Sequence, residues 1–342
     1  MAIFGDRNLD ESFPFSVKSD NLPVVIYRCL KPGEWPAAMD LWLDAFGDVG
    51  WIFETLNEGT ADRKLAHTLI AEEGGKIVGA VDVFMREVRD ERGEPVKIGG
   101  IGSVATHKDY RRMGISGQLL LNAIDLMERE GCGWSMLFAS YVSHYGRYGW
   151  EQIQWKAIIC HEPELPHAPP ELEIVALGNG GSWPLEEMAR VYDSFNAVRP
   201  LTHIRSKLYW EIPIRVRLER PDRRTWIARR NGRCVAYLVL KPRAAGTTER
   251  PEIVEYGFLP RAEEDFANLI GSSLINDVGR EVVIQTPFEP TLLQLIDRCF
   301  AHVRFTERFG PMVRAISPDW SVERIRALTN LDAAQSWDLD GF

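Results

Sequence analysis

The chain has 342 residues, which at roughly 150 residues per domain predicts about two domains, and 45% of its residues are hydrophobic. Its 49 acidic and 40 basic residues give a formal net charge of −9, which excludes a broad electrostatic surface for nucleic acid. No segment reaches the roughly 20 apolar residues of a membrane span, and the first residues are acidic where a signal peptide is basic. We therefore expect a globular, cytoplasmic protein without a nucleic-acid or membrane partner.

The cysteines indicate neither disulfide bonds nor a metal. They are odd in number and widely spaced, and no CxxC pair is present, so neither a disulfide framework nor a zinc site is predicted. We expect reduced, mostly buried thiols at Cys29, Cys132, Cys160, Cys234 and Cys299.

Strands and helices alternate in the first half of the chain. Residues 24–30 form an apolar run typical of a strand, and residues 35–46 repeat their apolar positions at helical spacing. Residues 67–88 contain two apolar runs around a Glu-Glu-Gly-Gly turn, which predicts a hairpin. Further strands are predicted at 96–106, 134–140 and 150–161, with a helix at 118–130. This order predicts a mixed α/β (α+β) fold around one sheet.

A proline-rich segment divides the sequence. Residues 161–170 hold four prolines, which oppose both helix and sheet and therefore predict a linker. Beyond it the pattern recurs, because residues 70–83 and 227–240 share the order apolar, Ala, two charges, turn pair, base and apolar strand. Duplication of one α/β unit explains this pattern, and chance similarity of two hairpins is the alternative. The expected parts are an N-terminal arm (1–23), a first domain (24–162), a linker (163–171), a second domain (172–316) and a C-terminal tail (317–342).

A basic, glycine-containing motif lies between the strand at 96–106 and the following helix. It reads Arg111-x-x-Gly114-x-Ser116, with Arg112 and Gly117 beside it. The N–H groups and dipole of a helix N-terminus favour a pyrophosphate there, the glycines allow close approach, and the arginines add charge-assisted hydrogen bonds. The alternative is a solvated basic turn that caps the helix. A Rossmann site is disfavoured because G-x-G-x-x-G is absent.

These residues resemble the GCN5-related N-acetyltransferases (GNAT), whose R/Q-x-x-G-x-G/A signature binds the pyrophosphate of acetyl-CoA. Ser116 departs from the last position of that signature. The segment from Tyr145 to Gly149 is similar to the Y-G-R-F/Y-G motif of the enhanced-intracellular-survival (Eis) branch, which has tandem GNAT units. That branch also has a C-terminal sterol-carrier-like domain, for which the tail at 317–342 is expected to be too short.

The resemblance implies roles for individual residues. Backbone groups of Val104 and Thr106 would hold the pantetheine and polarise the acetyl carbonyl, and Ser140 would contact the cofactor. Arg111, Arg112, Gly114, Ser116 and Gly117 would bind the phosphates of acetyl-CoA. Tyr145 fits the general acid that protonates the departing thiolate, because its free pKa of about 10 keeps it protonated at neutral pH; the alternative is a packed aromatic.

The sequence leaves more than one candidate for the general base. The strand at 96–106 has no Asp or Glu in the place where many GNAT enzymes keep their base. Resemblance to Eis-like enzymes implies the terminal carboxylate of Phe342, and His144 or water are the alternatives.

We expect an acetyl-CoA-dependent N-acetyltransferase acting on a primary amine of a small cationic molecule by direct attack, without a metal. Acidic and aromatic residues near 44–58, including Asp48, Trp51, Phe53 and Glu54, would receive that amine or simply cover the surface. The alternatives are an acyl-CoA-binding regulatory protein without turnover and a protein or peptide N-acyltransferase. Residues 214–224 are locally basic and fit a solvated face or a contact between subunits of a homo-oligomer.

The second copy is expected to be degenerate. After its strand it reads LPRAEEDFANL, with Glu263, Glu264 and Asp265 opening the helix and no R-x-x-G-x-G. Carboxylates at that place satisfy the helix dipole and repel pyrophosphate. One acetyl-CoA site per chain is therefore expected.

Overall fold

A computed structural model describes residues 24–47, 64–163, 169–178, 182–244, 246–247, 249–275 and 281–341. The chain divides into two compact units. Unit 1 contains the described residues of Met1–Gly59, Arg63–Phe84 and Ile101–Leu126, and unit 2 contains those of Met85–Gly100 and Met127–Phe342. The predicted mixed α/β class is confirmed. Residues 164–168 of the expected linker lie outside the described residues, and the expected domain boundaries stay a prediction.

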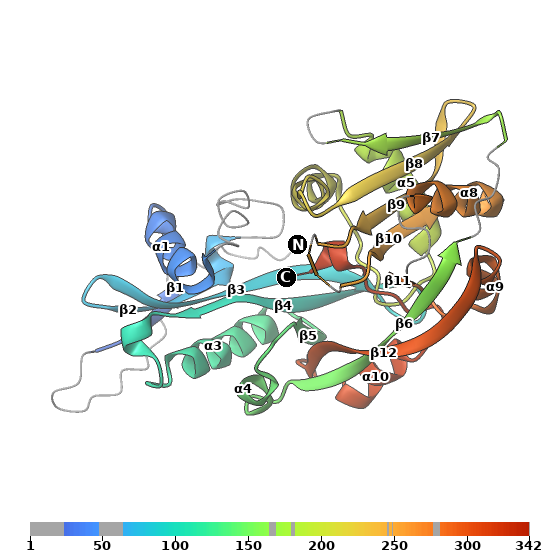
Figure 1. Ribbon diagram of the computed structural model, residues 1–342. Coiled ribbons are helices and arrows are strands. Elements are labelled where there is room, and N and C mark those ends of the chain that lie inside the picture. The colour runs from blue at the N-terminus through green and yellow to red at the C-terminus, as the bar shows by residue number, and fades with distance from the viewer. Residues whose placement is uncertain are drawn as a thin grey trace, which may run out of the picture. The chain divides into compact units, whose positions relative to one another are not determined.

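Unit 1 is a sheet with one helix on each face (Figure 1). Its strands run in the order β1-β2-β3-β4, and β2 pairs antiparallel with both β1 and β3. The strands are β1 (Ile26–Cys29), β2 (Thr68–Glu73), β3 (Lys76–Arg89) and β4 (Pro95–Thr106), of which β3 and β4 continue into unit 2. The helical elements are α1 (Trp35–Phe46), η2 (Leu65–His67), η3 (Lys108–Tyr110) and α3 (Ile115–Arg129).

The hairpin of unit 1 brings β3 close to α3. Gly74 and Gly75 adopt φ of +57° and +84° and make the β2–β3 turn, so the predicted hairpin is confirmed. A Cβ atom on Gly79 would lie 2.6 Å from Cγ2 of Ile115. Glycine at 79 therefore lets the start of α3 pack directly on β3.

Unit 2 contains strands from both halves of the sequence. Their order is β5-β12-β6-β11-β10-β9-β8-β7, in which β12 lies between β5 and β6 and is antiparallel to both. The strands are β5 (Trp134–Leu137), β6 (Glu151–Pro163), β7 (Leu172–Leu177), β8 (Arg224–Arg230), β9 (Arg233–Lys241), β10 (Glu252–Phe258), β11 (Glu281–Ile284) and β12 (Phe300–Ala315). The helical elements are α4 (Val142–Gly146), α5 (Leu185–Asn196), α6 (Lys207–Tyr209), η4 (Trp210–Ile214, a π-helical turn), α7 (Arg215–Leu218), α8 (Glu263–Ser273), α9 (Pro290–Asp297), α10 (Val322–Thr329) and η6 (Asp338–Asp340).

An aromatic cluster joins the helices, sheet and tail of unit 2. Phe266 of α8 stacks on Tyr256 and Phe258 of β10, with ring centroids 4.7 and 4.8 Å apart. Trp337 from the tail packs edge-on against Tyr256 at 5.2 Å and is 2% exposed. Because the tail supplies a core side chain, residues near the C-terminus are part of the fold rather than an appendage.

The two predicted hairpins share backbone irregularities at equivalent positions. The β2–β3 pair shifts register between Ala71 and Glu72, and the β8–β9 pair shifts between Ala228 and Arg229. The second turn uses Asn231 and Gly232 with φ of +52° and +74°, matching the positive φ of the first turn. These shared features support the expected duplication.

Replacing Gly79 by alanine is expected to destabilise the protein. Cγ2 is bonded to Cβ of Ile115 and cannot swing away without moving α3, so overpacking of about 1–3 kcal/mol is expected. Thermal unfolding of Gly79→Ala measures the effect. Gly178→Ala is the control, since no atom of the described residues lies within 4 Å of its added Cβ. Equal melting temperatures for the two variants would show that α3 does not pack on Gly79.

Candidate functional site

The junction between β4 and α3 in unit 1 is held in a defined shape. Ser103 has a φ of +54°, which distorts β4 shortly before its end. Its carbonyl oxygen accepts a 2.9 Å hydrogen bond from Nε1 of Trp42, a fully buried side chain of α1. The backbone N–H of His107 then donates to the carbonyl oxygen of Val78 at 2.9 Å. The distorted strand end is thus fixed to both α1 and β3.

The loop from Arg111 to Gly114, called the signature loop below, exposes its basic side chains to solvent. Arg112 and Gly114 adopt φ of +67° and +82°, so the backbone turns sharply just before α3. Nε of Arg111 donates to the carbonyl oxygen of Thr106 at 3.4 Å, and all three loop residues are exposed. Ser116 is half-buried and Gly117 is buried in the first turn of the helix. Exposed guanidinium groups beside a helix N-terminus provide the charge and the donors that bind an anion.

The remaining predicted cofactor contacts lie at strand ends. Val104 and Thr106 are half-buried at the end of β4 in unit 1. Ser140 is exposed, three residues after β5 in unit 2. The structure therefore gathers the signature residues and the end of β4 in one unit, and places Ser140 in the other.

Tyr145 lies in α4 of unit 2, beside a cavity of about 300 Å³ that it lines together with Tyr141, Ser143, His144 and Arg147. Burial raises the pKa of Tyr145, so its hydroxyl stays protonated at neutral pH. Burial and the nearby Arg147 charge lower the pKa of His144, whose ring centroid is 5.1 Å from that of Tyr145. A half-buried phenol is suited to donating a proton, and His144 is neutral at pH 7.

The last glycine of the Y-G-R-Y-G motif has a packing role. Gly149 adopts a φ of +85°, and an added Cβ would lie 2.1 Å from Nη1 of Arg314. That guanidinium group of β12 donates to the carbonyl oxygen of Tyr148 at 2.5 Å. Arg314 therefore contacts the turn after α4, and the positive φ of Gly149 favours glycine at that position.

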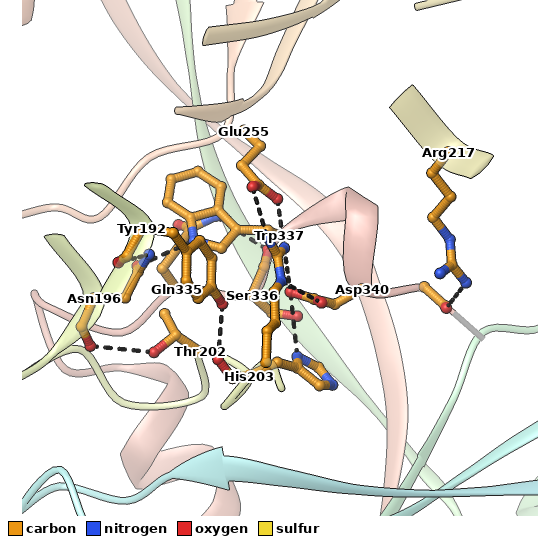
Figure 2. Close-up of polar contacts among 12 residues, drawn as sticks. Tyr192, Asn196, Thr202, His203, Arg217, Glu255, Gln335, Ser336, Trp337 and Asp340 are labelled. Atoms are coloured by element: carbon orange, nitrogen blue, oxygen red, sulfur yellow. Dashed lines mark hydrogen bonds and ion pairs between the residues drawn. The ribbon is translucent and has the colours of Figure 1, made fainter. Parts of the chain in front are cut away.

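The chain end is held by a buried network in unit 2 (Figure 2). Arg205, Glu255 and Asp340 have no exposed side-chain surface. Arg205 donates from Nη1 and Nη2 to Glu255 at 2.8 and 2.6 Å, and from Nε and Nη2 to Asp340 at 2.9 and 2.8 Å. Nδ1 of His203 lies 3.4 Å from Oδ2 of Asp340. One guanidinium group thus joins β10 to the tail.

Burial and the charge of Arg205 shift the pKa values of the titratable side chains in this network. Burial opposes ionisation of Asp340, but the Arg205 guanidinium outweighs it and holds the pKa of Asp340 well below its usual range. Burial raises the pKa of Glu255, although Arg205 acts in the opposite direction. Burial also lowers the pKa of His203, which is therefore neutral at pH 7. Asp340 is the carboxylate that stays ionised against Arg205 across the neutral range.

The backbone of the tail is held as firmly as its side chains. Nη1 of Arg86 donates to the carbonyl oxygens of Asp340 and Gly341, and Nη2 of Arg217 donates to that of Gly341 at 2.6 Å. The indole N–H of Trp337 donates to Oδ1 of Asn196 at 3.1 Å. The tail is fixed as far as Gly341, and Phe342, the predicted base, lies outside the described residues together with Asp48, Trp51, Phe53 and Glu54.

Sequence reasoning did not find the residues that hold the tail. Arg205, His203 and Glu255 are scattered through the second half of the chain, and no spacing connects them to Asp340. The sequence signal that pointed to a functional tail was the Asp-Gly-Phe sequence at its end.

The comparisons with known proteins agree with this geometry. Residues 26–153 match the family model described as an acetyltransferase (GNAT) domain. The chain carries a GNAT acetyltransferase domain. The expected resemblance and enzyme class are thereby confirmed. No curated protein matches the chain by sequence.

Solved structures of GNAT proteins share the fold over most of the chain. A probable N-acyltransferase of unknown function from Enterococcus faecalis V583 is 19% identical, with a TM-score of 0.65 over 86% of this chain and 73% of that chain. Eis1 from Mycobacterium abscessus is 17% identical, with a TM-score of 0.60 over 86% and 74%. A GCN5-related N-acetyltransferase from Anabaena variabilis is 14% identical, with a TM-score of 0.63 over 86% and 73%. The likeness to these structures shows that the chain shares their fold.

Other expectations concern the whole chain. The five cysteines, all within the described residues, form no disulfide bond, and four of them are buried, as predicted. Within the described ranges, no helix has the length and apolarity to cross a bilayer, and no group of three or more His, Cys, Asp or Glu side chains could hold a metal ion.

Asp340→Asn is expected to lower the free energy of unfolding by about 3–5 kcal/mol, because it leaves Arg205 buried without its second carboxylate. Asp338→Asn is the matched control, since Asp338 is 39% exposed and pairs with Arg223 in a contact worth about 0–1 kcal/mol. Urea unfolding of both variants measures the difference. Similar losses from the two variants would contradict a dominant role for the buried pair.

Proposed function

We propose that this GNAT protein transfers the acetyl group of acetyl-CoA to a primary amine of a small, cationic molecule. The observation that carries the proposal is the exposed Arg111–Gly114 loop at the start of α3, within the residues that match the acetyltransferase model. A solvated cap would need neither two arginines nor a strand end bent at Ser103. The reaction is direct attack in a ternary complex, without an acyl-enzyme.

Unit 1 supplies the proposed contacts to acetyl-CoA. Arg111 and Arg112 neutralise the pyrophosphate, and the backbone at Gly114, Ser116 and Gly117 donates N–H groups to its oxygens. Backbone groups of Val104 and Thr106 hold the pantetheine and donate to the acetyl carbonyl, whose oxygen gains charge as the amine attacks. Ser140 is a further proposed cofactor contact.

Tyr145 is the proposed general acid. The amine nitrogen bonds to the acetyl carbon, the carbon–sulfur bond then breaks, and the electron pair leaves on sulfur. The Tyr145 hydroxyl gives its proton to the thiolate, so the products are an N-acetyl amide and free CoA thiol. A pKa raised by burial keeps the proton on Tyr145 until the thiolate forms.

The terminal carboxylate of Phe342 is the proposed general base. The fixed tail supports this assignment, because termini usually fray and this one is bonded through Gly341 to Arg86 and Arg217. His144 is the alternative base beside Tyr145, and burial and Arg147 lower its pKa. Water is the remaining alternative.

The second copy is proposed to have no acetyl-CoA site. The turn before α8 has the same left-handed backbone as the signature loop, with φ of +71° at Arg261. Asp265 pairs with Arg230 and Glu264 pairs with Arg298, so carboxylates occupy the first turn of that helix. They oppose a pyrophosphate at the place where unit 1 attracts one.

A panel of amines tests the proposed reaction. The full chain is incubated with acetyl-CoA and amines that include aminoglycosides and polyamines, and free thiol is followed against a control without amine. Amine-dependent thiol release supports the transferase. Cofactor binding without release for any small amine, or release with peptide amines only, would favour a regulatory acyl-CoA binder or a peptide N-acyltransferase instead.

Arg111→Ala combined with Arg112→Ala is expected to weaken CoA binding, because each charge-assisted contact is worth about 1.5–3 kcal/mol in favourable cases. Titration calorimetry with desulfo-CoA measures the dissociation constant and the stoichiometry, which should be one per chain. Arg261→Ala is the control, since it removes an arginine of similar φ from the second copy. An unchanged constant in the double variant, or two sites per chain, would refute the assignment.

One glycine added after Phe342 is expected to lower kcat and leave CoA binding unchanged, because it moves the terminal carboxylate without altering the buried network. Steady-state rates with the best amine, together with the desulfo-CoA constant, measure both effects. Full activity in the extended chain would move the general base to His144 or water.

A further inference from the structure

A group of basic side chains extends from the signature loop to the β2–β3 turn of unit 1. Lys76 is the first residue of β3 after that turn, and His107 and Lys108 follow the end of β4. The hydrogen bond from the backbone N–H of His107 to the carbonyl oxygen of Val78 brings the two strand ends together. Lys76 and Lys108 are exposed and His107 is half-buried. The proposed contacts to the pyrophosphate use only the arginines of this group.

The imidazole ring of His107 holds the side chain of Lys76. Nζ of Lys76 lies 2.9 Å from Nε2 of His107. Because an ammonium group only donates hydrogen bonds, Nε2 is the acceptor, and the neutral ring carries its proton on Nδ1. An ammonium group has three N–H donors, of which this contact uses one, so further donors remain for a ligand. The ring thus positions the ammonium group beside the end of β4 without neutralising it.

The two glutamates that precede the β2–β3 turn are engaged elsewhere. Glu72 accepts a 2.9 Å hydrogen bond from Nε of Arg28, and Glu73 accepts one from the hydroxyl group of Tyr110. Lys76 forms no ion pair with a carboxylate in the described part of the chain. Its charge is therefore available to an anionic ligand, with which an ammonium group forms charge-assisted hydrogen bonds.

The cations that follow β4 are equally available. Within the described ranges, neither Lys108 nor the two arginines of the signature loop form an ion pair. The carboxylate in this segment is Asp109, whose side chain is 71% exposed and whose Oδ2 lies 3.7 Å from Nδ1 of His107. The positive charge of this surface therefore extends beyond the two arginines assigned to the pyrophosphate, although the whole chain has a net charge of −9.

We propose that Lys76, held by His107, and Lys108 bind the phosphate on the 3′ oxygen of the CoA ribose. A phosphate monoester carries a charge of about −1.5 to −2 at pH 7, which suits two ammonium groups without carboxylate partners. The protein therefore selects CoA over its dephospho form. This inference rests on the proposed acetyl-CoA site, and it adds the residues that decide which nucleotide enters that site.

Titration calorimetry of the full chain with CoA and with 3′-dephospho-CoA tests the assignment, because the two ligands differ only in that phosphate. The wild-type protein should bind CoA more tightly by about tenfold or more. Lys76→Ala should weaken CoA binding about tenfold and leave dephospho-CoA binding unchanged, whereas Lys76→Arg should keep the preference. Lys64→Ala is the matched control, since it removes an exposed lysine near the end of β2 that is remote from the turn. It should behave as the wild type.

A second pair of probes lacks the pantetheine arm. 3′-Phosphoadenosine 5′-phosphate should displace CoA about tenfold better than adenosine 5′-monophosphate, and Lys76→Ala should abolish that advantage. Melting temperatures report that each variant is folded. Equal binding of CoA and dephospho-CoA by the wild-type protein, or an unaltered preference in Lys76→Ala, would overturn this inference and leave the proposed acetyl transfer in place. If neither CoA nor dephospho-CoA binds, the proposed function fails together with it.

Discussion

The guanidinium group of Arg205 is the contact on which the end of the chain depends. It pairs with two carboxylates, Glu255 from β10 and Asp340 from the tail. The side chains of all three residues are fully buried. Its plane also lies against Tyr192, with Cζ 3.9 Å from the ring centroid. Burying charged groups is costly and gives little net stability compared with an apolar core. The contact instead fixes the position of the tail, because Asp340 must lie where Arg205 can pair with it.

The β2–β3 and β8–β9 hairpins, and the helices that come after them, share a backbone pattern but differ in charge. Arg112 and Arg261 both adopt left-handed backbone conformations just before a helix. In unit 1 the helix then starts with glycine and serine, and in unit 2 it starts with three acidic residues. Gly79, which admits α3, is replaced by Ala236 in the second hairpin. The two turns therefore share a backbone pattern but differ in charge, and the two hairpins differ in the space that they leave for a packed helix.

The sequence was sufficient to predict those elements that depend on neighbouring residues. The hairpin at 67–88 follows from alternating apolar residues around Gly74 and Gly75, and the signature loop follows from the spacing of arginines and glycines after a strand. The sequence was insufficient to predict contacts between residues that are far apart along the chain. Asp340 meets Arg205 across 135 positions, and no periodicity encodes such a pairing. The same holds for β12, because a strand's alternation specifies which face is buried but not which neighbours it takes.

The position of β12 determines when the protein can fold. β5 and β6 both take β12 as a neighbour, with Leu137 opposite Met312 and Ile158 opposite Phe305. During synthesis these two early strands therefore wait, with open edges, until residue 315 has left the ribosome. Contacts between such distant segments slow folding, and unpaired edges invite association with other chains. Unit 2 thus completes its sheet only after β12 has been made, more than 130 residues after β6.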